Sequence, residues 1–186
     1  MKIVAKYNFS DPALRWETNF PQALSEIEQV IASVQASPRL TSTSGRPPRN
    51  VFSPIDIEKE FQVAFLHAEW YGKRIECEYP SRYYLSGYKP DRRQKDGFRN
   101  MDFVKYKVGV EVQFGKYPYM IYSAAPKMII FHNHALIDAG VVIVPVKELA
   151  DQLHPGVSYF EQFSWDLEQV GNFSLGVPVL VLGVLA

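Results

Sequence analysis

The sequence predicts an α/β fold, a mixed β-sheet flanked by helices, in a single domain that spans residues 1–186. In several short segments, apolar residues either alternate with polar ones or run without interruption, which is typical of strands. Between these segments, apolar residues recur every three or four positions, as in amphipathic helices. A chain of this length can bury a core, and 47% hydrophobic with 22% charged residues is typical of a globular domain.

The N-terminal half is expected to hold a strand, two helices and a second strand. Asn19 is the expected cap of the first helix, and Ser53-Pro54 opens the second in the order typical of a helix start. In order, the expected elements are a strand at 2–9, a helix with apolar residues from Phe20 to Val34 that stops before Pro38, a Ser/Thr/Gly/Pro-rich loop at Thr41–Arg49, a helix from Ser53 to about Trp70, and a strand around Ser81–Leu85.

The C-terminal half is expected to alternate between short helices and buried strands after a central hairpin. Its closing apolar run, Val177–Ala186, is too short to span a bilayer and is expected to be a buried strand. In order, the elements are a short helix at 118–125, strands at Lys127–Phe131 and Val141–Val144, helices at Lys147–Leu153 and Tyr159–Val170, and a strand at Pro178–Val184.

The central hairpin carries the residues that most clearly indicate chemistry. Met101–Val104 is expected to fold back antiparallel on Val108–Phe114 through a reversal near Tyr106. That register puts Asp102 opposite Glu111, with Cα atoms about 5 Å apart. Two carboxylates this close repel each other unless a proton or a cation lies between them, and Mg²⁺ favours such oxygen ligands. Spacing alone also fits an ordinary exposed hairpin.

The sequence segments around this pair of carboxylates resemble those of a known family. DFVKYKVGVEVQFGKYPYMIY is similar to the catalytic segment of the BglII/BstYI group of type II restriction endonucleases, in the PD-(D/E)xK nuclease superfamily, with Gln in place of the usual Lys. MKIVAKYN, FSPIDIEKEFQVAFLHAEW and IDAGVVIVPVKEL resemble further segments of that group. The resemblance is greatest to its BstYI members and leaves out about residues 37–50 and 76–98. It implies a restriction-endonuclease-like fold.

The resemblance also implies a role for each matching residue. Asp102 and Glu111 would be the carboxylate ligands of Mg²⁺, with the carbonyl of Val112 as a further ligand. Gln113 would help place the attacking water, and being neutral it cannot be the general base. The group's upstream polar residue cannot be aligned, because Tyr79–Phe98 diverges.

DNA-contacting residues are expected in three places. The formal net charge is zero, which is unusual for a DNA-binding protein, so the distribution of basic residues matters more than their total. Arg92, Arg93 and Arg99 belong to a basic cluster just before the catalytic strand, which either contacts phosphates or is a solvated loop. By resemblance, Lys116 would serve the central base pairs or an adjacent phosphate, and His154-Pro155 the outer pairs.

Together these features predict a homodimeric, Mg²⁺-dependent type II restriction endonuclease acting on double-stranded DNA. By resemblance, its site would be a short palindrome with a central GATC, cut to leave 5′ overhangs, and its functional partner a cognate DNA methyltransferase. One cysteine and the absence of a signal peptide favour the cytoplasm, with no membrane association. A nuclease for modified or branched DNA and a catalytically inactive DNA- or partner-binding module remain alternatives.

The HNH tripeptide is a weaker signal. His132–His134 reads HNH, but residues of HNH nucleases are scattered over a ββα unit, so a polar turn is the simpler interpretation. The outer base pairs of the recognition site and the number of metal ions are left open by the sequence.

Overall fold

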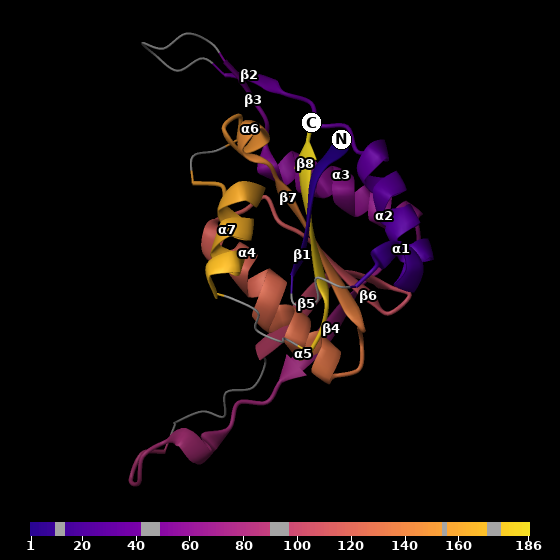
Figure 1. Ribbon diagram of the computed structural model, residues 1–186. Coiled ribbons are helices and arrows are strands. Elements are labelled where there is room, and N and C mark those ends of the chain that lie inside the picture. The colour runs from indigo at the N-terminus through magenta and orange to yellow at the C-terminus, as the bar shows by residue number, and fades with distance from the viewer. Residues whose placement is uncertain (10–13, 42–48, 90–96, 154–155, 171–175) are drawn as a thin grey trace.

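A six-stranded mixed sheet, in the order β1-β8-β7-β6-β5-β4, forms the centre of the computed structural model (Figure 1). The structure describes residues 1–9, 14–41, 49–89, 97–153, 156–170 and 176–186. Neighbours β6, β7 and β8 are parallel, and the other pairs are antiparallel. The strands are β1 (Lys2–Phe9), β4 (Tyr71–Cys77), β5 (Gly97–Lys105), β6 (Val108–Val112), β7 (Ala139–Pro145) and β8 (Val179–Leu185), with a separate ribbon of β2 (Arg39–Thr41) and β3 (Arg49–Val51). The predicted α/β class is confirmed.

Helices cover both faces of the sheet (Figure 1). Those on one face are α1 (Trp16–Asn19), α2 (Pro21–Ser33) and α3 (Pro54–His67), and those on the other are α4 (Tyr117–Tyr122), α5 (Met128–Asn133) and α7 (Phe160–Val170). Three shorter elements are the 3₁₀ turn η1 (Ser81–Tyr83), the π-helical turn η2 (Ser123–Lys127) and α6 (Lys147–Ala150). None of the helices in the described part of the chain has the length and apolar character needed to cross a membrane.

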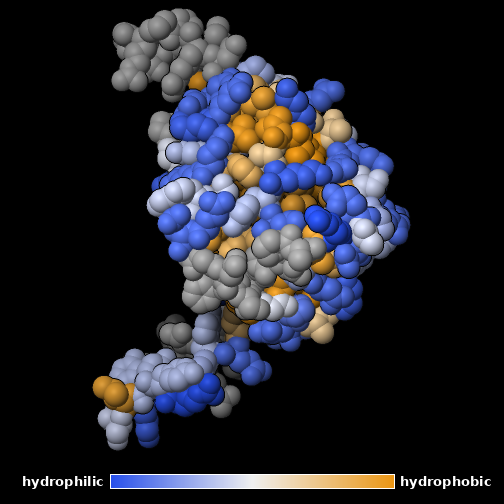
Figure 2. All heavy atoms as spheres, viewed as in Figure 1, coloured by the Kyte–Doolittle hydropathy of each residue, from blue (hydrophilic) through white to orange (hydrophobic). Residues whose placement is uncertain are grey.

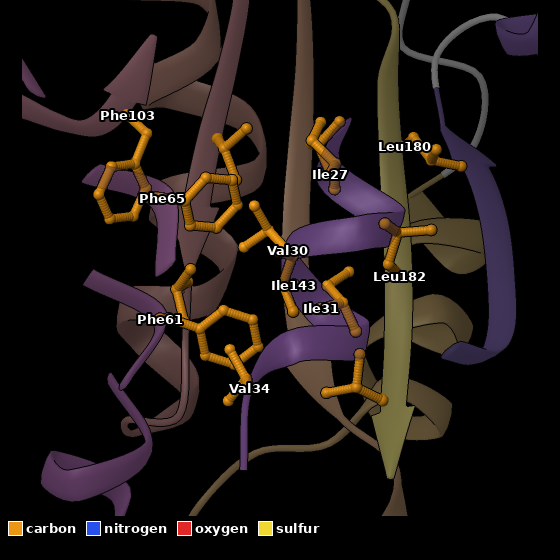
Figure 3. Packing of buried hydrophobic residues seen from close by; sticks show 14 of the residues in the cluster. Ile27, Val30, Ile31, Val34, Phe61, Phe65, Phe103, Ile143, Leu180 and Leu182 are labelled. Carbon is orange, nitrogen blue, oxygen red and sulfur yellow. The ribbon is translucent and has the colours of Figure 1, made fainter. Parts of the chain in front are cut away.

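The two faces bury two hydrophobic clusters, divided by the alternation of side chains along each strand. In β7, Val141 and Ile143 pack under α2 and α3, whereas Val142 and Val144 pack under α5 and α7. Because both faces are covered, β7 and β8 are apolar without interruption, which is why both strands could be predicted. Figure 3 shows the first cluster, where Ile27, Val30 and Ile31 of α2 point at the sheet, and Phe65 of α3 lies beside Phe103.

Of the two helix caps predicted from the sequence, the one at Ser53 is confirmed and the one at Asn19 is not. Ser53 caps α3, and its Oγ accepts a hydrogen bond from the Asp56 N–H at 3.3 Å, as expected. The cap assigned to Asn19 is wrong, because Asn19 ends the short α1 and Phe20 precedes Pro21 at the start of α2. A proline suits the first turn of a helix, where its missing N–H leaves no bond unmade.

Four other predicted elements are corrected by the structure. Ser81–Leu85 is not a strand but contains η1, and the strand in this region is β4. β4 escaped prediction because it is an edge strand whose one buried side chain is Ile75, so no alternation is visible. Lys127–Phe131 is helical rather than a strand, and Lys147–Leu153 forms a helix only as far as Ala150. β6 ends at Val112, before Gln113 and Phe114.

Residues 78–89, the described part of the segment between β4 and β5, project away from the sheet (Figures 1 and 2). Their described side chains include exposed tyrosines and Leu85, which is 84% exposed, and orange spheres mark the tip of the projection in Figure 2. The rings of Tyr84 and Tyr88 contact each other with centroids 5.1 Å apart.

Candidate active site

The β5–β6 hairpin places the two predicted carboxylates together. Tyr106 and Lys107 form its two-residue turn, and both have positive φ angles, 51° and 61°, as a type I′ turn requires. Pairing of Phe103 with Val110 continues the register that sets Asp102 across from Glu111. The predicted reversal near Tyr106 and the predicted register are therefore confirmed.

At the site, β5 and β6 are joined by hydrogen bonds from backbone N–H groups to carboxylates, in place of the usual backbone-to-backbone bonds between strands. The Asp102 N–H donates to Glu111 Oε1 at 3.1 Å, and the Val112 N–H donates to Asp102 Oδ2 at 3.0 Å. Glu111 is 1% exposed, whereas Asp102 is open to solvent through a cavity. Both carboxylates are thus held by the strands themselves rather than by a loop.

An irregularity in β5 coincides with Asp102. Between the pairs Tyr71–Val104 and Lys73–Met101, β5 has one residue more than β4, so β5 bulges at Asp102-Phe103 opposite Gly72. A Cβ on Gly72 would lie 3.3 Å from the Asp102 carbonyl oxygen, which makes the small residue useful at this close approach. Bulges redirect a side chain, and here the redirected side chain is a carboxylate.

A cavity of about 410 Å³ opens over the two carboxylates and is lined by residues of α3, β5, β6 and η2, together with Gln113. Helix α3 contributes Glu58 and Gln62, which are one turn apart and flank its buried stripe. Glu58 Oε1 accepts a hydrogen bond from the Phe114 N–H at 3.4 Å. The sequence did not single out Glu58, although two polar residues four apart beside a buried stripe are a usable signal.

Ser123 and Lys127 of η2 complete the site from the opposite face. Lys127 Nζ lies 2.5 Å from Glu111 Oε2 in an ion pair, and the Lys127 side chain is 14% exposed. Ser123 Oγ lies 3.2 Å from Glu111 Oε2 and 3.4 Å from Gln113 Oε1. Neither residue was singled out from the sequence, because Ser123 was assigned to a helix at 118–125 and Lys127 to a separate strand, whereas both belong to one π-helical turn.

The carboxyl groups in the cavity hold their protons more tightly than usual. Burial, followed by the charge of Asp102, raises the pKa of Glu111 to about 7 against the opposing effect of Lys127. Asp102 is reached by solvent, but the walls of the cavity remove part of its hydration, and this desolvation also raises its pKa, opposed by the Val112 N–H and Lys127. The pKa of Glu58 is raised by burial and by the charge of Asp102. The site therefore carries more negative charge than its surroundings neutralise, which a divalent cation would offset.

The donor set fits Mg²⁺ as part of a larger coordination sphere. Among the described residues, no three His, Cys, Asp or Glu side chains converge closely enough to bind a metal by themselves. Two carboxylates and a backbone carbonyl are nevertheless what Mg²⁺ commonly takes from a protein, with water and phosphate oxygens as the other ligands. Asp102, Glu111 and the carbonyl of Val112 are the residues that would hold it.

Of the residues predicted to contact DNA, Lys116 and Arg99 lie in the part of the chain that the structure describes. Lys116 forms a bridge to Val157, and the Ser158 N–H donates to the Gly115 carbonyl at 3.3 Å, so the loop after β6 lies against the segment that starts at Gly156. Arg99 lies on β5, with its guanidinium 5.9 Å from the Tyr122 ring centroid. Arg92, Arg93, His154 and Pro155 lie outside the described residues.

Two basic residues near the site were not predicted. Lys73 and Arg74 of the edge strand β4 line a second hollow of about 380 Å³, which Asp102 also borders. His132, by contrast, lies in the last turn of α5, where its Nδ1 is 3.0 Å from the Ile137 carbonyl oxygen, and it does not line the cavity. The HNH tripeptide is thus part of a helix end, in agreement with a structural role.

The fold is that of the restriction endonucleases, as comparisons with solved structures show. The crystal structure of restriction endonuclease BglII complexed with a DNA 16-mer is 19% identical and superposes with a TM-score of 0.69, covering 100% of this chain and 77% of that one. Free BglII, also 19% identical, gives a TM-score of 0.62 and covers 100% and 80%.

Sequence comparison gives the family. The restriction endonuclease BglII/BglIII family matches residues 4–184. The type II restriction enzyme BglII of Bacillus subtilis is 20% identical over 190 residues, which cover 100% of this chain and 77% of that enzyme. The chain belongs to the BglII/BglIII restriction endonuclease family, and is a type II site-specific deoxyribonuclease.

Proposed function

We propose that this endonuclease is a Mg²⁺-dependent homodimer that cuts both strands of a short palindrome with a central GATC, leaving 5′ overhangs. The observation that carries the proposal is the carboxylate pair formed by the solvent-accessible Asp102 and the buried Glu111, fixed at the end of the β5–β6 hairpin in a chain of this family. The GATC centre and the overhangs rest on the resemblance of the catalytic segment. We also propose that residues 1–186 act as a single nuclease domain.

Each residue of the site has a proposed task. Bound at Asp102, Glu111 and the Val112 carbonyl, Mg²⁺ would provide positive charge beside the phosphate and acidify a water molecule. Gln113, which lines the cavity, orients the attacking water through its amide but cannot take up its proton. Glu58 is the upstream polar residue of the site, because it reaches the same cavity from α3.

DNA binding is proposed for residues around this cavity. A BglII structure contains a DNA 16-mer, which supports double-stranded DNA as the substrate of the present chain. Lys116 would contact the central pairs or a neighbouring phosphate, and His154-Pro155 the outer pairs. Arg99, together with Arg92 and Arg93, would contact phosphates, and Lys73 and Arg74 extend this basic surface along β4.

The dimer is supported by an apolar stripe on α3. Ile55, Val63 and Leu66 are 63%, 52% and 42% exposed, and helical spacing puts them on one side of the helix. A palindrome presents two identical half-sites, which a two-fold dimer matches. A cognate methyltransferase would protect host DNA, and both enzymes would work in the cytoplasm, where that DNA lies.

Digestion of unmethylated plasmid DNA of known sequence tests the proposal. Discrete bands whose ends map to GATC-centred sites, produced with Mg²⁺ and suppressed by a chelator, are expected. Discrete bands whose ends map to sites without GATC would refute the proposed sequence specificity but would still support the proposed cleavage reaction. Cleavage confined to modified or branched DNA, or DNA binding without cleavage, would favour the alternative functions instead.

A further inference from the structure

The cavity contains a positive charge that the family motif does not account for. Of the described residues that line it, Lys127 is the one cation, facing Glu58, Asp102 and Glu111. Its ammonium pairs with Glu111 Oε2 at 2.5 Å, and its side chain is 14% exposed. This ammonium is largely buried and lies against a carboxylate that we propose as a metal ligand. It therefore occupies a position that favours a positive charge.

The backbone explains how this lysine reaches the site. Tyr117–Asn133 is helical throughout, but its middle part, η2, is a π-helical turn that contains Pro126. The wider turn accommodates a proline, which lacks the N–H and crowds an ordinary helix. Ser123 and Lys127, four residues apart, both reach Glu111 Oε2 from this turn. Turns of this kind are frequent at functional sites.

The residue at the usual lysine position cannot carry such a charge. Gln113 lines the same cavity and is neutral at every pH, whereas its neighbour across the cavity, Lys127, is cationic. We propose that Lys127 provides, from the helix, the positive charge that Gln113 lacks: its ammonium pairs with Glu111 in the metal-free protein, competes with the divalent cation for that carboxylate, and once displaced contacts a phosphate oxygen of the DNA. The last step rests on the proposed function.

A permanent ion pair is the competing explanation. In that case Lys127 only neutralises a buried carboxylate, and its removal would weaken folding and metal binding together. Competition predicts the opposite for the metal, because a cation within 2.5 Å of Glu111 disfavours a second cation at the same oxygen. The affinity of the DNA-free protein for Mg²⁺ therefore separates the two explanations.

Calorimetric titration of the DNA-free protein with Mg²⁺ is the first test. It is done at pH 8.5 and repeated at pH 9 and 9.5, because loss of Lys127, which lowers the pKa of Glu111, leaves a proton on that carboxylate up to a higher pH. Lys127→Met is expected to bind Mg²⁺ about ten-fold more tightly than wild type. Lys127→Arg keeps the charge and should stay near wild type. Unchanged or weaker binding by a folded Lys127→Met protein would overturn the proposal.

Matched controls keep the titration interpretable. Lys6→Met removes an exposed lysine that pairs with Glu28 at 2.8 Å on the edge strand β1, far along the sheet order from β5 and β6. It should leave Mg²⁺ affinity unchanged, and circular dichroism and thermal unfolding show whether each variant is folded. Lys127→Gln, which can keep a hydrogen bond to Glu111, replaces the methionine variant if that protein does not fold.

Single-turnover cleavage at saturating Mg²⁺ tests the phosphate contact. Lys127→Met is expected to be about 100-fold slower, as when one group that stabilises developing charge is removed. Adding Gln113→Lys to Lys127→Met should recover part of the rate. If Lys127→Met binds Mg²⁺ more tightly than wild type but cleaves DNA at the wild-type rate, the proposed contact between Lys127 and a phosphate is refuted. If wild-type protein cuts no DNA, the proposed function fails, while the Mg²⁺ titration still decides the competition.

Discussion

Asp102 and Glu111 are joined across the end of the β5–β6 hairpin, where the Asp102 N–H donates a hydrogen bond to Glu111 Oε1 at 3.1 Å. The Val112 N–H returns a bond to Asp102 Oδ2 at 3.0 Å, so the backbone of each strand fixes the carboxylate of the other. Sites built on strands keep their geometry better than sites built on loops. The same bonds persist only while the register of the hairpin is kept.

Removing either charge is expected to abolish cleavage without unfolding the protein. Asp102→Asn and Glu111→Gln keep the shape of the side chain but remove a proposed ligand of Mg²⁺. DNA binding, measured by gel shift without metal, should be retained or tighter, because less negative charge faces the phosphate. Wild-type cleavage by Asp102→Asn at ordinary Mg²⁺ concentrations would remove Asp102 from the mechanism.

The raised pKa of Glu111 gives the metal-free protein a defined pH dependence. Burial and the charge of Asp102 raise this pKa from 4.5 to about 7, so the folded chain binds the proton more tightly than the unfolded chain. The stability linked to that proton is present below about pH 4.5 and is lost as the pH rises through 7. Glu111→Gln should therefore gain melting temperature relative to wild type between pH 5 and 8 in a chelator. A difference in melting temperature between Glu111→Gln and wild type that stays constant over this pH range would contradict the raised pKa of Glu111.

Gln113→Lys restores the commoner motif but is expected to reduce cleavage in the wild-type background. Lys127 already places an ammonium at Glu111, and a second one beside it would repel both Lys127 and the metal. Mg²⁺ affinity and single-turnover rate should both fall. Faster cleavage with tight metal binding would show that the site accepts a lysine on the strand.

Glu26 is expected to stabilise the hairpin that carries the site. Its carboxylate accepts hydrogen bonds from Lys105 at 2.8 Å, Tyr106 at 2.7 Å and Trp70 at 3.0 Å, and so ties the hairpin turn to α2. Burial alone would raise the pKa of Glu26, but these three hydrogen bonds lower it. Stability linked to its charge is therefore present at neutral pH and lost as the pH falls through that lowered pKa.

Denaturant unfolding at pH 7 measures this contribution. Glu26→Ala should lower the free energy of unfolding by about 1–3 kcal/mol, because three donors lose their acceptor. Glu28→Ala, on the same helix, breaks only the exposed pair with Lys6 and should change it by less than about 1 kcal/mol. Equal effects of the two substitutions would argue against a special role for Glu26.

The sequence was informative where the structure depends on local pattern. Alternation in Val108–Val112, the turn at Tyr106 and the uninterrupted apolar strands β7 and β8 all follow from neighbours in the chain. The register of one hairpin was then enough to bring Asp102 to Glu111. Half of the site could be predicted because a single hairpin builds it.

The other half depends on packing between distant elements. Lys127 reaches Glu111 only because a π-helical turn absorbs Pro126, and no local pattern predicts that turn. Glu58 faces the cavity because α3 packs its buried stripe against Phe103 and Phe114, which fixes the rotation of the helix. β4 has one buried side chain and pairs with β5 through a bulge, so neither its existence nor the turned position of Asp102 was visible in the sequence.

The outer base pairs of the recognition site are expected to depend on His154. The resemblance to the BglII/BstYI group implies that the stretch before Gly156 faces the outer base pairs, and this chain has Leu153-His154-Pro155 there. Proline has no N–H to donate, and a histidine can donate or accept, so the outer preference should differ from that of the group. Lys116 lies against Val157 in the following segment and would read or flank the central pairs.

Mapping of cleavage sites on DNA of known sequence, for wild type and His154→Ala, tests both halves of this specificity. The wild type should cut at GATC-centred sites with a restricted choice of flanking pairs, and His154→Ala should relax that choice while keeping the centre. Lys116→Ala is the matched comparison, because loss of a central or phosphate contact should slow cutting at every site about equally, without changing the flanking preference. Wild-type sites without GATC would refute the central half. An unchanged flanking preference in His154→Ala would refute the outer half.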